Sequence, residues 1–139
     1  MKLFLEIITP IKVVLKEEID EITIPTVNGE ISILPGHIDL FTKITPGEMI
    51  IRKNNKIEPF AIMGGFLEVT KNHINILADY AAHVNDIEIS KVQEAKVRAE
   101  KAMNDKDKEL EYEQLQDDIR RAALQLKIAK KHKSHPRTS

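Results

Sequence analysis

The hydrophobic and polar positions along the chain follow two different patterns, and the pattern changes near residue 85. Between Leu3 and Asp79, isoleucine and valine recur in short runs that proline, glycine and asparagine interrupt, which is typical of many short β-strands. Ile22 and Ile24 alternate with polar neighbours, so this run has one buried and one solvated face. The predicted strands are Leu3 to Ile8, Lys12 to Lys16, Ile19 to Ile24, Glu30 to Ile33, Met49 to Arg52, Ile57 to Met63, Phe66 to Val69 and Ile74 to Leu77.

Beyond residue 85 the period becomes helical. Ser90 and Gln93 form a capping-box pattern that predicts the start of a first helix, which ends near Asn104. Asp105 and Asp107 lie in the break that follows, where we expect them to cap a second helix. That helix has one narrow apolar stripe, which favours the seam of an antiparallel hairpin over a globular core. The stripe consists of Tyr112, Leu115, Ile119, Ala122, Leu126 and Ala129.

Turn residues divide the β-rich part. Leu34 to His37 contains Pro-Gly and predicts a sharp reversal, and Asn54 with Asn55 predicts a hairpin turn because asparagine tolerates left-handed backbone. Gly64 and Gly65 predict a bulge or a close approach of another backbone. We therefore expect a β-sandwich or barrel over residues 1–85 and a helical hairpin with a frayed basic tail over residues 86–139.

Composition narrows the possible functions. The net charge of -1 provides no general field for nucleic acid, and a chain without tryptophan or cysteine has neither a rich set of stacking side chains nor disulfides. The acidic Glu6 comes too early for a secretory signal peptide, and no apolar run reaches the roughly 20 residues of a membrane-spanning helix. Any membrane association is therefore expected through a partner.

Residues with catalytic or metal-binding chemistry are sparse. His37 and Asp39 are close in sequence but have no serine or cysteine nucleophile in a recognisable context. The remaining histidines lack neighbours with zinc-ligand spacing, and no glycine-rich phosphate loop precedes a helix. We expect no catalytic residue, no metal and no cofactor.

Two segments carry a resemblance to a known family. The run from Gly29 to Thr42, which contains Leu-Pro-Gly-His, and the run from Gly64 to Val69 resemble the ε subunit of the rotary ATP synthase. Ile76 to Asp79, Glu94 to Glu100, and Arg121 to Ala129 are similar to later segments of that family in the same order. The resemblance therefore covers nearly the whole chain.

The resemblance implies a sandwich of about ten strands followed by a helical hairpin. It also implies a non-catalytic rotor subunit of a proton-translocating ATP synthase, held peripherally at the cytoplasmic face of a bacterial inner membrane. The implied partners are the γ subunit, the ring of c subunits and the α/β catalytic head, with no nucleic acid.

Four sandwich residues match interface positions of the family. Thr9 and Glu30 match the ring-facing end, and His37 and Thr42 match the γ-facing side. The basic last helix matches a segment that meets the catalytic head and inhibits hydrolysis, although basic residues late in a helix also suit the helix dipole. The basic residues concerned are Arg120, Arg121, Lys127, Lys130 and Lys131.

Some family members bind regulatory ATP on the hairpin. The aligned residues here are Ile87, Glu88, Lys91 and Arg98. Glutamate replaces the family's aspartate, and Lys91 replaces an arginine that can make two parallel hydrogen bonds. We therefore expect no tight binding of ATP.

Two other classes of function fit the residues less well. Fold alone does not fix function, so the chain could instead be a free-standing β-sandwich adaptor or a module that binds a small ligand or glycan, with a coiled-coil tail. Such a module would self-associate and would not bind ATP synthase subunits. An enzyme would require a constellation of reactive residues that the chain does not display.

Overall fold

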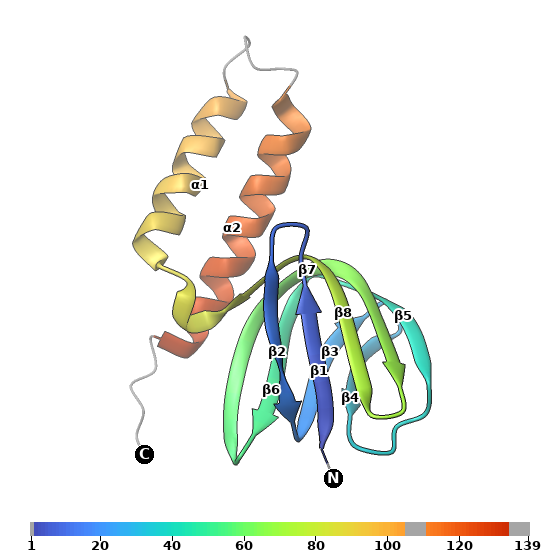
Figure 1. Cartoon of the computed structure of the whole chain (residues 1–139). Coiled ribbons are helices and arrows are strands. Elements are labelled where there is room, and N and C mark those ends of the chain that lie inside the picture. Colours follow the sequence, from blue (N-terminus) through green and yellow to red (C-terminus); the bar gives the residue numbers. More distant parts are fainter. Residues whose placement is uncertain (1, 105–110, 134–139) are drawn as a thin grey trace. The chain divides into compact units, whose positions relative to one another are not determined.

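The chain folds into two compact units, Met1–His83 and Val84–Ser139. The computed structural model describes residues 2–104 and 111–133. Figure 1 shows strands in the first unit and two helices in the second. The predicted fold class, a β-sandwich followed by a helical hairpin, is confirmed.

The first unit contains eight described strands. All strand pairings are antiparallel except that of β1 with β8, which is parallel. The strand order is β2-β1-β8-β7-β5-β3-β4, and β6 pairs with both β3 and β7. The strands are β1 (Leu3–Ile8), β2 (Val13–Ile19), β3 (Glu21–Thr26), β4 (Gly29–Ile33), β5 (Leu40–Ile44), β6 (Gly47–Lys53), β7 (Lys56–Thr70) and β8 (His73–His83).

Strand β7 belongs to both layers of the sandwich. Its first part pairs with β6 through Ile62, and its last part, from Gly65, pairs with β5. The prediction of separate strands on either side of Gly64 and Gly65 is therefore wrong, because β7 is one continuous strand. The family resemblance implied about ten strands, whereas the described residues form eight.

The glycine pair marks a close approach between strands. A Cβ atom at Gly65 would lie 2.0 Å from the carbonyl oxygen of Leu77, and the φ angle of Gly65 is +118°. Both conditions exclude an ordinary side chain at this position. The register with β8 is the same before and after the pair, so the glycines permit contact rather than a bulge.

The core of the first unit comes from alternate positions of its strands. Leu3, Leu5 and Ile7 of β1 are fully buried, and Ile22 and Ile24 of β3 are buried as predicted. Burial of aliphatic side chains is the main favourable term in forming such a layer. The core consists of Leu3, Leu5, Ile7, Ile19, Ile22, Ile24, Ile33, Ile44, Met49, Ile51, Phe60, Ile62, Leu67, Val69, Ile74, Ile76, Ala78 and Ala81.

Some strand boundaries differ from those predicted. The predicted strand from Ile19 to Ile24 belongs to two strands, because the chain bends at Asp20 between β2 and β3. Strand β5 was not predicted at all. The hairpin turn at Asn54 and Asn55 is confirmed, and both residues have left-handed φ angles, +51° and +64°.

The second unit begins with the short 3₁₀ helix η1 (Val84–Asp86) and continues with α1 (Ile89–Met103) and α2 (Tyr112–Lys133). The helices α1 and α2 pack against each other as an antiparallel pair (Figure 1). Ala122, Leu126 and Ala129 of the predicted stripe are buried, whereas Tyr112 is exposed. The seam is therefore closed along the later turns of α2.

The start of α1 differs from the predicted capping box. The N-cap is Glu88, which makes no side-chain capping hydrogen bond, and Ser90 is already inside the helix. The expected caps of the second helix, Asp105 and Asp107, lie outside the described residues, as does the tail from residue 134.

Candidate functional site

The outer surface of β1, β8, β7 and β5 carries a group of apolar side chains. Register places Leu77 of β8 between Ile8 of β1 and Phe66 of β7. Phe41 of β5 lies opposite Glu68, one pleat along from Phe66. Strand alternation turns their neighbours inward and leaves Phe41, Phe66 and Leu77 68%, 46% and 57% exposed. We call Ile8, Phe41, Phe66 and Leu77 the apolar face.

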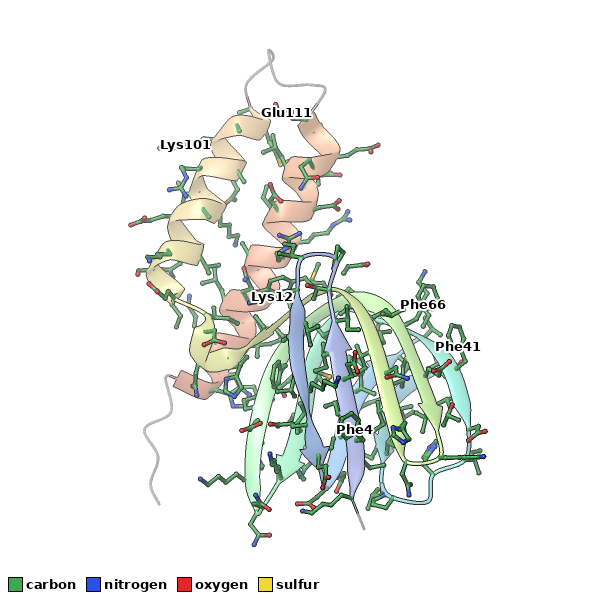
Figure 2. All side chains as sticks on the ribbon, viewed as in Figure 1. Phe4, Lys12, Phe41, Phe66, Lys101 and Glu111 are labelled. Carbon is green, nitrogen blue, oxygen red and sulfur yellow. The ribbon has the colours of Figure 1, made fainter. Side chains whose placement is uncertain are left out.

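The apolar face borders a groove of about 270 Å³. Phe41 and Phe66 project from neighbouring strands (Figure 2), and their rings stack with centroids 5.7 Å apart at 16°. The amide of Asn75 donates a hydrogen bond to Glu68 Oε1 at 3.2 Å. The groove is lined by Glu6, Ile8, Phe41, Phe66, Glu68, Asn75, Ile76 and Leu77.

Exposed aromatic and aliphatic side chains gathered in one place indicate a surface that another protein covers. The sequence prediction missed this surface because β5 was not recognised. The alternation in Leu40 to Ile44, with Thr42 and Ile44 buried and Phe41 and Lys43 exposed, was the available signal.

The two residues expected on the γ-facing side lie in different settings. Thr42 is 8% exposed and points to the inner face of β5, where its hydroxyl accepts a hydrogen bond from the Asn28 amide at 3.5 Å. His37 is half-buried in the turn after β4, and its backbone amide donates to the Leu34 carbonyl at 3.1 Å. The neighbours of Thr42 in β5, Phe41 and Lys43, are exposed on the outer surface. His37 lies in a turn and belongs to no strand.

The two residues expected at the ring-facing end lie in separate hairpins. Thr9 belongs to the β1–β2 turn, where its hydroxyl donates to the Lys12 carbonyl at 3.2 Å. Ile11, at the tip of this turn, is 92% exposed. Glu30 is exposed near the start of β4, opposite Pro25. The hydroxyl of Thr9 thus shapes a turn that presents Ile11.

The basic residues of α2 are exposed. Arg120 forms an ion pair with Asp117 one turn earlier, with 3.7 Å between Nη1 and Oδ1. Arg121, Lys127, Lys130 and Lys131 are also exposed. Such surface cations interact weakly one at a time, so any docking role requires several together.

The residues aligned with the nucleotide motif are not brought together. Ile87 is buried, and the ammonium of Lys91 pairs with the carboxylate of Glu88 at 3.2 Å. Arg98 lies farther along α1, on a shallow surface of about 460 Å³ shared with Ser90, Gln93, Glu94 and Val97. The Lys91 ammonium, which would have to bind a phosphate group, is thus already paired with Glu88.

Within residues 2–104 and 111–133, no three His, Cys, Asp or Glu side chains are placed to hold a metal ion. In the same part of the chain, no helix is long and apolar enough to cross a membrane.

Comparison with known proteins agrees with the family resemblance of the sequence. Residues 2–84 match the family model described as "ATP synthase, Delta/Epsilon chain, beta-sandwich domain". The ATP synthase epsilon chain of Herpetosiphon aurantiacus is 40% identical over 130 residues, which cover 94% of this chain and 96% of the relative. That of Chloroflexus aggregans is 34% identical over 139 residues and covers both chains fully, at 100%.

Two solved structures share the fold. A chain of the Euglena gracilis mitochondrial ATP synthase superposes with a TM-score of 0.66 and 23% identity, over 96% of this chain and 82% of that one. A chain of the Tetrahymena thermophila mitochondrial ATP synthase central stalk and c-ring gives a TM-score of 0.54 and 20% identity, over 62% and 69%. At these identities the structures support the fold alone.

Proposed function

The chain belongs to the ATP synthase epsilon-chain family, and from that membership we propose that it is a non-catalytic rotor subunit of a bacterial proton-translocating ATP synthase. In this role it joins the c-subunit ring to the γ subunit and the α/β catalytic head. The observation that carries the proposal is identity of 34–40% to epsilon chains over 94–100% of the chain, because this range includes both the sandwich and the hairpin.

The apolar face is the surface we assign to the γ subunit. It offers exposed aromatic side chains on a rigid sheet, and such side chains supply most of the binding energy in protein interfaces. Thr42 supports the assignment through its neighbours, because Phe41 and Lys43 point outward on either side of it. His37 is a flanking position in this assignment.

The turn that contains Thr9 and the start of β4 at Glu30 are the surfaces we assign to the c-subunit ring. Ile11 is almost fully exposed at the tip of the first turn, and an apolar side chain presented in this way suits insertion between partner side chains. Glu30 adds an exposed carboxylate. The complex holds the chain peripherally at the cytoplasmic face of the inner membrane.

The hairpin is a candidate inhibitor of ATP hydrolysis. Its exposed cations on α2 complement an acidic surface, which we assign to the catalytic head. Regulation by bound ATP has little support, because Lys91 is paired with Glu88 and lies apart from the surface that contains Arg98.

Co-purification tests the proposed function. A tagged full-length chain, expressed in its own organism, is expected to bring down γ, c, α and β subunits with ATPase activity from detergent-solubilised membranes. A tag on an unrelated cytosolic protein is the control. Recovery of the chain as a homo-oligomer without ATPase subunits would contradict the proposal and support the free-standing adaptor.

A further inference from the structure

Two carboxylates lie within the groove of the apolar face. Glu6 of β1 and Glu68 of β7 are both opposite Asn75 of β8, so the three side chains form one row across three strands. Neighbouring strands are about 4.8 Å apart, so the backbones of the two glutamates are separated by about 10 Å. Asn75 donates a hydrogen bond to Glu68 and fixes that carboxylate on one side of the row.

Neither carboxylate forms an ion pair with a described residue. Lys16 lies opposite Glu6, and Lys43 lies opposite Phe66. Both lysines are near enough in register to pair, yet neither nitrogen comes within the 4.0 Å of an ion pair. Two negative charges between apolar side chains would lose hydration when a partner covers the face, and an unpaired buried charge is costly.

The surroundings of Glu68 favour one kind of cation. Phe41 lies opposite Glu68 across the β5–β7 pair, and its ring stacks with that of Phe66. An arginine guanidinium is planar, is weakly hydrated, stacks on aromatic rings and binds carboxylates through parallel hydrogen bonds. A lysine ammonium is a compact and strongly hydrated charge, so it fits the aromatic wall less well.

We propose that the groove receives an arginine side chain of the γ subunit. The guanidinium lies between Glu6 and Glu68 and against the ring of Phe66, which the stacked ring of Phe41 supports from the far side of Glu68. Aliphatic side chains of the same γ segment cover Ile8 and Leu77. The groove has a volume of about 270 Å³, which suits a single long side chain. The inference rests on the proposed function and adds the chemistry of the contact.

Calorimetric titration of the full-length chain with the purified γ subunit of the same organism tests the carboxylates. Glu6→Gln and Glu68→Gln are each expected to weaken binding at least about tenfold, because the buried γ cation would then lose one of its two counter-charges. They should also reduce the loss of affinity between about 0.1 M and about 1 M salt. Glu58→Gln removes a charge from the part of β7 that pairs with β6 and is expected to change neither quantity.

Arginine modification tests the identity of the cation. One γ arginine is expected to be protected from a dicarbonyl reagent by the parent chain and to lose that protection with Glu68→Gln. Protection of a γ lysine from acylation in place of an arginine would overturn the assignment of arginine.

The outcomes separate this inference from the proposed function. A parent chain that does not bind γ overturns the rotor assignment and the inference with it. A parent chain that binds γ as tightly as both glutamine variants overturns the inference alone. Unfolding midpoints in urea equal to that of the parent show that the variants are folded.

Discussion

Gly65 is the residue on which the close approach of β7 to β8 depends. An added Cβ would lie 2.0 Å from the Leu77 carbonyl oxygen and 2.8 Å from the Ala78 Cα, and both contacts are to backbone that cannot rotate away. At Gly64 the nearest atom is Asp79 Oδ2 at 2.8 Å, which belongs to a movable side chain. Two adjacent glycines thus have different tolerances for a methyl group.

Gly65→Ala is expected to destabilise the sandwich by about 3 kcal/mol or more, because the strand must move away from β8 and the residue must keep a positive φ. Gly64→Ala is the matched control, with an expected cost of about 1–2 kcal/mol for left-handed backbone. Urea unfolding of both full-length variants measures the difference. Equal midpoints for the two variants would contradict the assigned role of Gly65.

Asp20 joins three parts of the sandwich through its carboxylate. It pairs with the Lys2 ammonium and accepts a hydrogen bond from the Asn54 backbone amide at 2.9 Å. The hydrogen bond from Lys2, followed by that from Asn54, lowers the pKa of Asp20 below its ordinary value of 3.8. A lowered pKa means that the folded state favours the ionised carboxylate, so ionised Asp20 stabilises the fold. This stabilisation is fully present above the ordinary pKa and is lost as the pH falls through the pKa of Asp20 in the folded protein.

Asp20→Asn is therefore expected to lower the urea midpoint modestly at neutral pH and to have no effect well below pH 3.8. Asp39→Asn, a change at another exposed aspartate, serves as the control and should leave the midpoint unchanged. A difference between Asp20→Asn and the parent that persists at the acidic end would show that charge is not the cause.

Local chemistry determined which single residues were predictable. Asn54, Asn55 and Gly65 were interpreted correctly because backbone conformation and close approach depend on the residue's own side chain. The inward direction of Thr42 and the row of Glu6, Asn75 and Glu68 depend on strand register. Register pairs Glu6 with Asn75, far away along the chain, and one sequence does not reveal such a pairing.

The element α1 begins without a capping side chain. Glu88 occupies the N-cap position and its carboxylate pairs with Lys91 instead of accepting from the free helix amides. Aspartate, serine, threonine and asparagine are the side chains that satisfy those amides. The first turn of α1 therefore lacks the stabilisation that a side-chain cap provides.

Glu88→Asp is expected to stabilise α1 by about 0.5–1 kcal/mol, because the shorter carboxylate reaches the amides of the first turn and the negative charge is retained. Hydrogen exchange of the amides in α1 measures the gain. Ser90→Ala is the control and should have an effect within about 0.5 kcal/mol, since Ser90 is inside the helix. Slower exchange in Ser90→Ala than in Glu88→Asp would contradict the observed helix start.

Elements differed in how well the sequence predicted them. The helices were recognised because their apolar period extends over several turns, as Ala122, Leu126 and Ala129 show. The bend at Asp20 was missed because one residue without proline or glycine carries no strong signal. Strand β5 was missed because it is only five residues long and begins shortly after the Leu34 to His37 turn, so its alternation is brief.

At the level of the whole molecule, the core of the first unit, as far as the described residues show, is made of side chains between Leu3 and Ala81. A fragment of residues 1–85 is accordingly expected to unfold in one cooperative transition in urea, with a denaturant slope proportional to its own buried surface. The full-length chain is the reference. A broad, non-cooperative transition of the fragment would show that the sandwich requires residues beyond 85.

The exposed cations of α2 give a prediction for the assembled enzyme. Replacing Arg120, Arg121, Lys127, Lys130 and Lys131 by alanine is expected to raise ATP hydrolysis about tenfold while the rotor still assembles. An exposed ion pair contributes about 0–1 kcal/mol, and a tenfold change in hydrolysis corresponds to about 1.4 kcal/mol. Several pairs must therefore act together. Alanine keeps helix propensity high, so helix loss is not expected.

A salt series with membranes that carry either chain measures the effect. Salt should relieve inhibition by the parent chain and have less effect on the five-alanine variant. Lys96→Ala with Lys101→Ala, two cations of α1, is the control. Equal hydrolysis by parent and five-alanine membranes at every salt concentration would contradict the electrostatic mechanism.

The parallel pairing of β1 with β8 has a consequence for synthesis on the ribosome. The first strand made must wait for the last strand of the sandwich, because Ile8 pairs with Leu77. At about 5–20 residues per second, translation separates the two by about 3 to 14 seconds. During that interval the β1–β2 hairpin has one edge without its partner, and such an edge is prone to misassociate with other chains. The order of synthesis therefore leaves this hairpin open to misassociation that the stability of the finished sandwich does not reveal.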